Sequence, residues 1–200
     1  MIKLDKLYNK PLEIVTLNSF IPKEEIKKIK ENIQGISENK ATAISDWRVS
    51  RVKWLPFDKP FDSLYQNIGK LIQDYNSNIW RFNLGSIINP FQYTEYHGSE
   101  EGKYNWHIDL GKENYASHRK LSLSIQLSDP SEYEGGDLQI FNPILSNNIN
   151  SSPETVPYQT ISKEQGSIAI FPSFLLHRVT PVTSGVRKSL VLWVGSKPFK

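Results

Sequence analysis

Two patterns of apolar residues divide the chain near residue 79. Before that point, "IPKEEIKKIKENI" and "FDSLYQNIGKLIQDYN" repeat apolar residues at helical spacing, which predicts two helices. The runs "LEIVTLNSF" and "WRVSRVKWL" are typical of strands. We expect both helices to pack on the outside of a sheet through apolar stripes. These stripes are Ile26, Ile29 and Ile33 in the first helix and Leu64, Ile68, Leu71, Ile72 and Tyr75 in the second.

From residue 79 onward the chain consists of short runs that alternate apolar and polar residues, separated by Gly, Pro, Asn and Asp. The runs are "IWRFNLGSII", "FQYTEYH", "YNWHIDL", "KLSLSIQLS", "DLQIF", "YQTIS", "SIAIF" and "SLVLWV". They follow one another too closely for helices between them, which predicts an antiparallel sandwich or jelly roll. The polar stretch 143–157 is expected to be a loop, and a mobile lid is one interpretation of it.

Length and composition limit the class of protein. With 200 residues the chain is expected to form one domain, with 1–78 supporting a β core at 79–200. A net charge of +3 gives no indication of a nucleic-acid or membrane partner, and the absence of cysteine excludes disulfides and thiolate metal sites. The start of the chain lacks the apolar core of a secretory signal and no run is long enough to span a membrane, so a cytoplasmic protein is expected. The oligomeric state is left open.

The stretch "YNWHIDLG" places two ionisable residues close together. Trp106, Ile108 and Leu110 alternate as the buried face of a strand would. His107 and Asp109 are then expected side by side on the opposite face. A pair of this kind occurs by chance in many sequences, and becomes a candidate metal site only with a further ligand.

His177, in "FPSFLLHRVTPV", is that further candidate. Two histidines and one carboxylate on one face of a metal leave positions open for a cosubstrate and O₂, the arrangement typical of non-haem Fe(II) oxygenases. A structural role for His177 remains the alternative at this point. The other two histidines, His97 and His118, lie in polar stretches and are expected at the surface.

An arginine in the last strand adds to this pattern. Alternation in "GVRKSLVLWV" places Arg187, Ser189, Val191 and Trp193 on one face, with Leu190, Leu192 and Val194 on the other. A buried guanidinium requires an anion, and its planar fork matches a carboxylate. The order His, Asp, His, Arg therefore indicates a metal site next to an anion site.

With these residues in place, the chain resembles the Fe(II)/2-oxoglutarate-dependent dioxygenases, in their prolyl 4-hydroxylase-like branch and closest to the PKHD-type hydroxylases of bacteria and phages. The resemblance covers roughly residues 80–198, and its most specific stretches are "LSDPSEYEGGDLQIF" and "FPSFLLHRVTPVTSGVR". It implies a mainly β (α+β) fold: a cupin-like double-stranded β-helix with the N-terminal helices outside one sheet. "EYEGGDL" itself is interpreted as structural, since Gly135 and Gly136 permit a tight turn.

The resemblance also implies roles for individual residues. His107, Asp109 and His177 match the iron ligands, and Arg187 matches the residue that binds the distal carboxylate of 2-oxoglutarate. Tyr96 matches a tyrosine that reaches the cosubstrate, and Ser189 is a candidate to assist Arg187 there. Tyr104 and Trp193 match aromatic residues of the substrate pocket, and Ser124 and Gln126 are further candidates for that pocket. The implied reaction consumes 2-oxoglutarate and O₂, releases succinate and CO₂, and hydroxylates an unactivated C–H bond of a peptidyl, prolyl-type residue or a small molecule, with ascorbate as a reductant.

Two departures and three alternatives stay open. The spacing from Tyr96 to His107 is longer than in such relatives, and Gln126 stands where several of them carry an aromatic residue that contacts the cosubstrate. A halogenating relative would lack the carboxylate of Asp109, and a nucleic-acid demethylase would carry a second arginine near Trp193. A non-enzymatic jelly roll that binds metal or carbohydrate is the alternative from another class.

Overall fold

The computed structural model describes residues 10–36, 43–44, 46–142 and 157–199. Its two α-helices are α1 (Lys23–Gln34) and α2 (Asp62–Asn78), and its three short 3₁₀ helices are η1 (Gly98–Glu100), η2 (Asn114–His118) and η3 (Pro130–Glu132). The strands are β1 (Val15–Leu17), β2 (Ala43–Ile44), β3 (Arg48–Trp54), β4 (Ser86–Ile87), β5 (Gln92–His97), β6 (Lys103–His107), β7 (Arg119–Gln126), β8 (Tyr133–Gly135), β9 (Leu138–Phe141), β10 (Tyr158–Thr160), β11 (Ile168–Pro172), β12 (His177–Val179) and β13 (Val182–Gly195).

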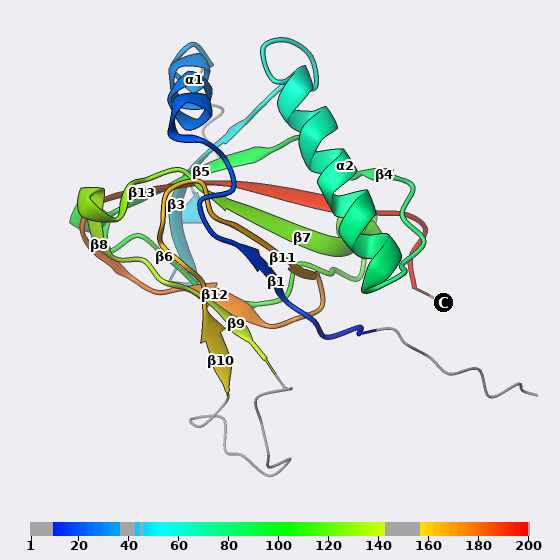
Figure 1. Cartoon of the computed structure of the whole chain (residues 1–200). Helices are drawn as coiled ribbons and strands as arrows, with labels where there is room; N and C mark the ends of the chain where they lie inside the picture. The colour runs from blue at the N-terminus through cyan, green and yellow to red at the C-terminus, as the bar shows by residue number, and fades with distance from the viewer. Residues whose placement is uncertain (1–9, 37–42, 45, 143–156, 200) are drawn as a thin grey trace, which may run out of the picture.

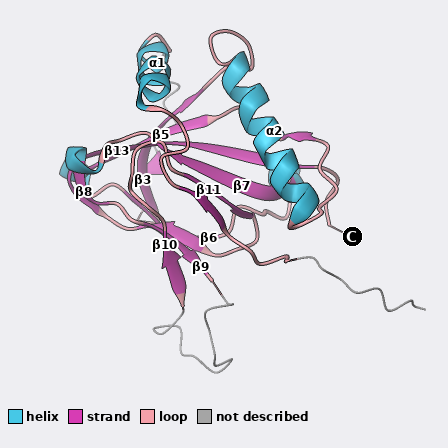
Figure 2. Cartoon of the chain, in the orientation of Figure 1, coloured by secondary structure: helices cyan, strands magenta, loops and turns pink. Residues whose placement is uncertain are grey.

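The strands form one curled antiparallel sheet. Its order is β1-β11-β7-β13-β5-β3-β6-β12-β9-β10, with β2 on β3 and both β4 and β8 on β13. Figures 1 and 2 show the half around β7, β11 and β13 lying over the half around β6, β9, β10 and β12. Many neighbours in this order are far apart in sequence, which is the jelly-roll connectivity that the alternating runs predict.

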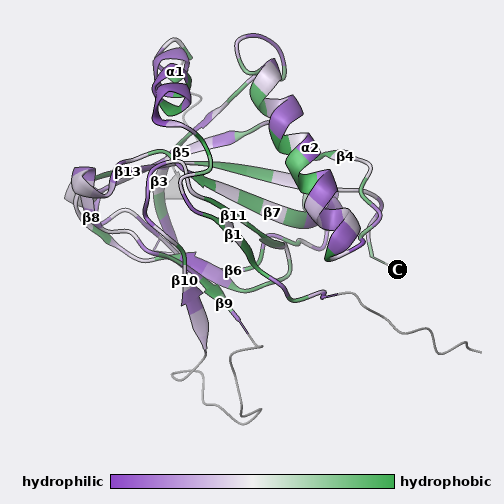
Figure 3. Ribbon diagram, viewed as in Figure 1, coloured by the Kyte–Doolittle hydropathy of each residue, from purple (hydrophilic) through white to green (hydrophobic). Residues whose placement is uncertain are grey.

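The two predicted helices cover one face of the β7–β11–β13 half (Figure 1). Hydrophobic and hydrophilic residues alternate along both helices in Figure 3. The predicted stripes face inward: Ile26, Ile29 and Ile33 of α1 are buried in the same apolar cluster as Ile68 and Ile72 of α2. That cluster also contains side chains from β7, β11 and β13, so the helices and the sheet share a core.

A second, smaller cluster lies inside the curl of the sheet. Residues of β11 alternate between the two clusters: Ile168 and Ile170 join the helix-side cluster, whereas Ala169 and Phe171 join the inner one. The inner cluster also takes Ile140 from β9 and Val179 from β12. The two halves of the sheet are therefore held together by apolar contacts that surround the candidate site.

Two sequence expectations about strands are wrong. The run at 79–88 was expected to be a strand, but only β4 forms there, because α2 extends to Asn78 and a turn follows. The alternation across 104–111 also fails, since β6 ends at His107 and Ile108 is 47% exposed. Asp109 reaches the site from the segment after the strand.

The expected loop 143–157 lies, except for Pro157, outside the described residues. Neither helix described by the structure is long and apolar enough to cross a membrane.

Candidate metal and anion site

The two histidines meet because their strands pair in register. His107, the last residue of β6, lies opposite His177, the first residue of β12. Side chains of opposed residues in an antiparallel pair share one face, and here the ring centroids are 4.1 Å apart. Residues 70 positions apart in sequence thus present their imidazoles to the inside of the curl.

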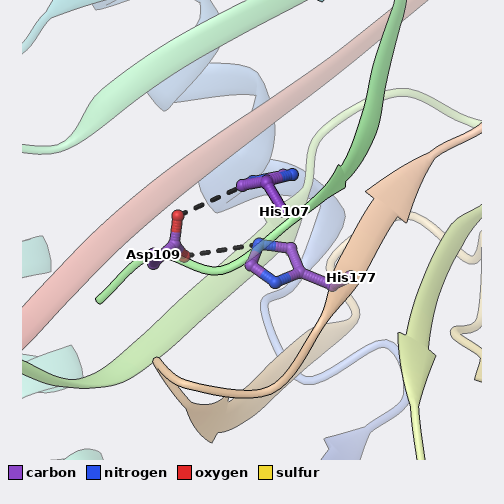
Figure 4. Close-up of side chains that lie close together, drawn as sticks. All are labelled: His107, Asp109 and His177. Atoms are coloured by element: carbon purple, nitrogen blue, oxygen red, sulfur yellow. Dashed lines mark ion pairs between the residues drawn. The ribbon is translucent and has the colours of Figure 1, made fainter. Parts of the chain in front are cut away.

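Asp109 is held between the histidines by backbone contacts to a distant turn. Its N–H donates to the Ser173 carbonyl at 2.9 Å, and the N–H of Leu110 donates to the same oxygen at 3.0 Å. The Asp109 Oδ2 lies 3.4 Å from His177 Nε2 and accepts a hydrogen bond from Ser122 Oγ at 2.7 Å. The Asp109 Oδ1 lies 3.7 Å from His107 Nε2 (Figure 4).

Burial and the attraction between neighbouring charges shift the pKa of all three groups. Desolvation, aided by the neighbouring His177, lowers the pKa of His107 to about 4, so that this imidazole is neutral at pH 7. Burial acts against charging Asp109 and His177, but their mutual attraction outweighs it. The pKa of Asp109 therefore falls below its usual range and that of His177 rises. The pocket holds a carboxylate that attracts a cation strongly.

The donor set fits a divalent metal. One ligand atom from each of His107, Asp109 and His177 can be chosen so that all lie within 4.8 Å of one another. Both Nδ1 atoms sit 2.8–2.9 Å from backbone carbonyls, of Asn105 and Leu175 respectively. Because a carbonyl only accepts, each Nδ1 must carry a proton, so Nε2 is the atom of each ring that faces Asp109 and can bind a metal when it is deprotonated.

The other two histidines lie elsewhere. His97 was expected at the surface, but it ends β5, is partly buried and lies 2.9 Å from Glu95. His118 ends η2 and is partly exposed. Within the described residues, neither belongs to the group of potential metal ligands.

Arg187 supplies a buried cation in the same cavity. Its side chain is 4% exposed, donates from Nη1 to Ser189 Oγ at 3.2 Å and lies 5.6 Å from the Tyr96 ring centroid. None of the ion pairs formed among the described residues includes Arg187. A buried guanidinium without a carboxylate partner favours an anionic ligand.

One cavity of about 190 Å³ connects the metal-ligand group with Arg187. The predicted alternation of β13 is confirmed, because Arg187, Ser189, Val191 and Trp193 line this cavity while Leu190, Leu192 and Val194 enter the helix-side core. The cavity can therefore take a metal at one end and an anion at the other.

The structure also places the remaining candidates. Tyr96, Tyr104, Trp193 and Ser124 line the cavity, and the Tyr104 ring stacks on His107 with centroids 3.5 Å apart. Gln126 does not line it: this side chain faces a small adjoining cavity behind Arg187. The difference arises because Gln126 Nε2 turns away to donate to Tyr133 and to the carbonyl of Ser128.

Several lining residues were missed by the sequence analysis. Arg48, Trp54 and Arg119 line the cavity, and the Arg119 guanidinium stacks 3.8 Å from the Trp193 ring centroid. Ser122, which holds the Asp109 carboxylate, was visible in "KLSLSIQLS" as part of the polar face of an alternating strand. No local pattern marks Arg48 or Trp54, because β3 meets the site only through sheet pairing.

Comparison with known proteins gives the family. Residues 91–195, more than half of the chain, match the model of the 2OG-Fe(II) oxygenase superfamily. A PKHD-type hydroxylase of Synechococcus sp. (strain CC9311) is 39% identical over 97 residues, which cover 48% of this chain and 38% of that protein. The match to a second PKHD-type hydroxylase, from Hyphomonas neptunium, likewise covers 39% of its length. The matched segment thus spans less than half the length of these curated relatives.

Solved structures agree on the fold. A prolyl-4-hydroxylase of Pseudomonas putida superposes with a TM-score of 0.70 at 15% identity, covering 93% of this chain and 94% of that one. A prolyl hydroxylase of Trichoplax adhaerens, solved with a peptide fragment of hypoxia inducible factor, gives 0.68 at 17% identity over 92% and 83%. These likenesses confirm the predicted double-stranded β-helix. The family uses Fe(II) and 2-oxoglutarate as cofactors, and the chain belongs to the 2OG-Fe(II) oxygenase superfamily.

Proposed function

We propose that this chain is an Fe(II)- and 2-oxoglutarate-dependent hydroxylase. His107, Asp109 and His177 hold Fe(II), and Arg187 binds the distal carboxylate of 2-oxoglutarate with help from Ser189 and Tyr96. One observation carries the proposal: a His–Asp–His group and a buried arginine outside every ion pair among the described residues face the same cavity.

When both are bound, Fe(II) and 2-oxoglutarate supply O₂ activation, with release of succinate and CO₂ and insertion of one oxygen atom into a C–H bond. The protein's own groups prepare that chemistry. The carbonyls of Asn105 and Leu175 orient the two imidazoles, and Ser122 orients the Asp109 carboxylate. Tyr104 and Trp193 form aromatic walls that exclude water from the centre.

The substrate is a peptidyl, prolyl-type residue or a small molecule that enters beside Tyr104. This part of the proposal rests on the relatives, which include a prolyl hydroxylase solved with a peptide fragment. The cavity adds that the reacting C–H bond must approach between aromatic rings, since Tyr104 and Trp193 both line it. Ascorbate would serve as a reductant that keeps the iron in its Fe(II) form.

Two measurements test the proposal. First, Fe(II)-loaded protein is incubated with 2-oxoglutarate labelled at C1, and labelled CO₂ is counted with and without candidate peptides. Second, those peptides and a cell lysate are searched by mass spectrometry for a gain of one oxygen. We expect CO₂ release that needs Fe(II), O₂ and Asp109. Protein that neither binds 2-oxoglutarate nor releases CO₂ at full iron loading would contradict the proposal and favour a non-enzymatic binding module.

A further inference from the structure

A buried phenol, Tyr133, lies directly behind Arg187. Tyr133 is the first residue of β8 and is 5% exposed. Its oxygen accepts a hydrogen bond from Gln126 Nε2 at 3.0 Å. The same Nε2 donates to the carbonyl of Ser128 at 3.2 Å, which fixes it as the amide nitrogen. Gln126 is therefore a donor to the phenol, and the phenol proton is not directed at Gln126.

A second neighbour of the phenol, Arg187, is a donor as well. A Cβ at Gly136, where φ is +63°, would lie 3.0 Å from Arg187 Cδ and 3.2 Å from Tyr133 Cε2, so the glycine leaves room for both side chains. Burial raises the pKa of Tyr133, and the nearby charges of Arg187 and Lys163 offset part of that rise. A guanidinium can only donate.

The phenol proton is thus left without an acceptor among the residues that the structure describes. Its oxygen accepts the hydrogen bond from Gln126, and the neighbouring guanidinium of Arg187 can only donate, so neither side chain can take the proton. A buried donor without a partner is unfavourable, so a ligand that accepts this proton is favoured. Arg187 also lies outside the ion pairs of the described residues, so it favours an anionic ligand. An anion with two acceptor oxygens could accept from both Arg187 and Tyr133.

The cavities show where such an anion would lie. Tyr133 and Gln126 line a space of about 10 Å³, enough for about one water or one carboxylate oxygen. Arg187, Ser124 and Leu138 line both this space and the main cavity, so the two adjoin at the guanidinium. We propose that Tyr133 donates its hydroxyl proton to the distal carboxylate of 2-oxoglutarate, and that Gln126 is a positioning residue that orients the phenol for this contact.

This inference rests on the proposed function, and it assigns roles that the sequence left open. Gln126 contributes to the cosubstrate site through Tyr133, without contacting the cosubstrate itself. Tyr133 forms the second wall of the anion site, although it comes from the stretch "EYEGGDL" that the sequence analysis interpreted as structural. The close packing around Gly136 brings that stretch against Arg187.

The test compares two cosubstrates that differ only at the distal end. Anaerobic calorimetry on Fe(II)-loaded protein measures the Kd of 2-oxoglutarate and of 2-oxopentanoate, which has a methyl group in place of the distal carboxylate. We expect Tyr133→Phe to weaken 2-oxoglutarate about ten-fold to a hundred-fold, as for a hydrogen bond to a charged group, and to leave 2-oxopentanoate unchanged. Gln126→Glu should also weaken 2-oxoglutarate, because a carboxylate would accept the phenol proton and repel the anion.

A matched control is Tyr65→Phe. Tyr65 is another buried tyrosine, with hydrogen bonds to the Leu55 carbonyl and the Phe91 N–H in the helix-side core. Its loss should lower the Tm without changing either Kd. If Tyr133→Phe weakened both cosubstrates equally, or neither, while Arg187→Ala still weakened 2-oxoglutarate, the role of Tyr133 would be overturned and the proposed function would stand. Wild-type protein that binds no 2-oxoglutarate would overturn both.

Discussion

Strands β7 and β13 present two different environments on their two faces. The helix-facing residues Leu121, Leu123 and Ile125 of β7 and Leu190, Leu192 and Val194 of β13 belong to one apolar cluster with α1 and α2. The opposite face carries Ser122, Ser124 and Gln126 of β7 and Arg187, Ser189 and Trp193 of β13. The same strands therefore build the core on one side and the ligand site on the other.

This contrast separates stability from binding. Burying apolar side chains against the helices stabilises the sheet, whereas burying Arg187 inside the curl, outside the ion pairs of the described residues, opposes folding until an anion binds. The apolar face must supply the free energy that keeps the polar face in place. Substitutions on the helix-facing side should consequently lower the free energy of unfolding, whereas those on the opposite side should weaken ligand binding.

The largest effect is expected from the metal ligands. His177→Ala and Asp109→Gly should abolish turnover and weaken Fe(II) binding by more than the roughly 10- to 100-fold typical of losing an outer-shell partner. Metal analysis and circular dichroism on the purified variants measure occupancy and fold. His118→Ala is the control and should retain iron. Full iron occupancy with normal activity in His177→Ala would show that other residues hold the metal.

Arg187→Ala comes next. Two charge-assisted hydrogen bonds of about 1.5–3 kcal/mol each correspond to a loss of 2-oxoglutarate affinity of about a hundred-fold to ten-thousand-fold. Arg187→Lys should fall between, since lysine keeps the charge but loses the fork. Iron affinity should stay the same in both.

The control for this position is Arg178→Ala, which removes an arginine of β12 that donates to Gln139 and lies 4.6 Å from the Trp106 ring centroid. It should leave the Kd of 2-oxoglutarate unchanged. An Arg187→Ala protein that binds 2-oxoglutarate as tightly as the parent would make Arg187 a structural residue.

Leu192→Ala probes the opposite face of the same strand. Leu192 is fully buried, and its truncation should lower the free energy of unfolding by about 2–5 kcal/mol in a urea titration. The Kd of 2-oxoglutarate for the folded protein should not change. If affinity fell as strongly as stability, the two faces would be coupled and the separation proposed here would be wrong.

The smallest effect is expected at Ser189. Its Oγ accepts the hydrogen bond from Arg187 Nη1, so the loss of this bond reaches the cosubstrate only through the orientation of the guanidinium. Ser189→Ala should therefore weaken 2-oxoglutarate about two-fold to ten-fold in calorimetry. A loss as large as that of Arg187→Ala would mean that Ser189 contacts the carboxylate itself.

Periodicity predicted the parts of the molecule that depend on local pattern. The stripes of α1 and α2 and the two faces of β13 follow from spacing alone, because burial of one face requires it. The alternation expected around His107 and Asp109 was wrong for a physical reason. Asp109 is positioned by the carbonyl of Ser173, a contact that spacing within "YNWHIDLG" cannot reveal.

The position of Tyr133 in the anion site could not be predicted from local spacing either. Tyr133 lies beside Arg187 because Gly185 pairs with it across β8 and β13, and because Gly136 leaves room for both side chains. Gln126 was recognised as a departure from relatives, but its link to Tyr133 depends on sheet geometry. The sequence thus predicts which residues can bind a metal or an anion, whereas the contacts that orient these residues come from distant strands.

The most direct test of the account is an anaerobic titration of Fe(II)-loaded protein with 2-oxoglutarate, followed by the visible spectrum. Chelation of the iron by the cosubstrate gives a weak charge-transfer band. The account predicts this band in the parent and in Leu192→Ala at the same 2-oxoglutarate concentration, and in Arg187→Ala only at a concentration about a hundred-fold or more higher. A parent protein with full iron occupancy that shows neither the band nor any binding of 2-oxoglutarate would contradict the claim that one cavity holds both.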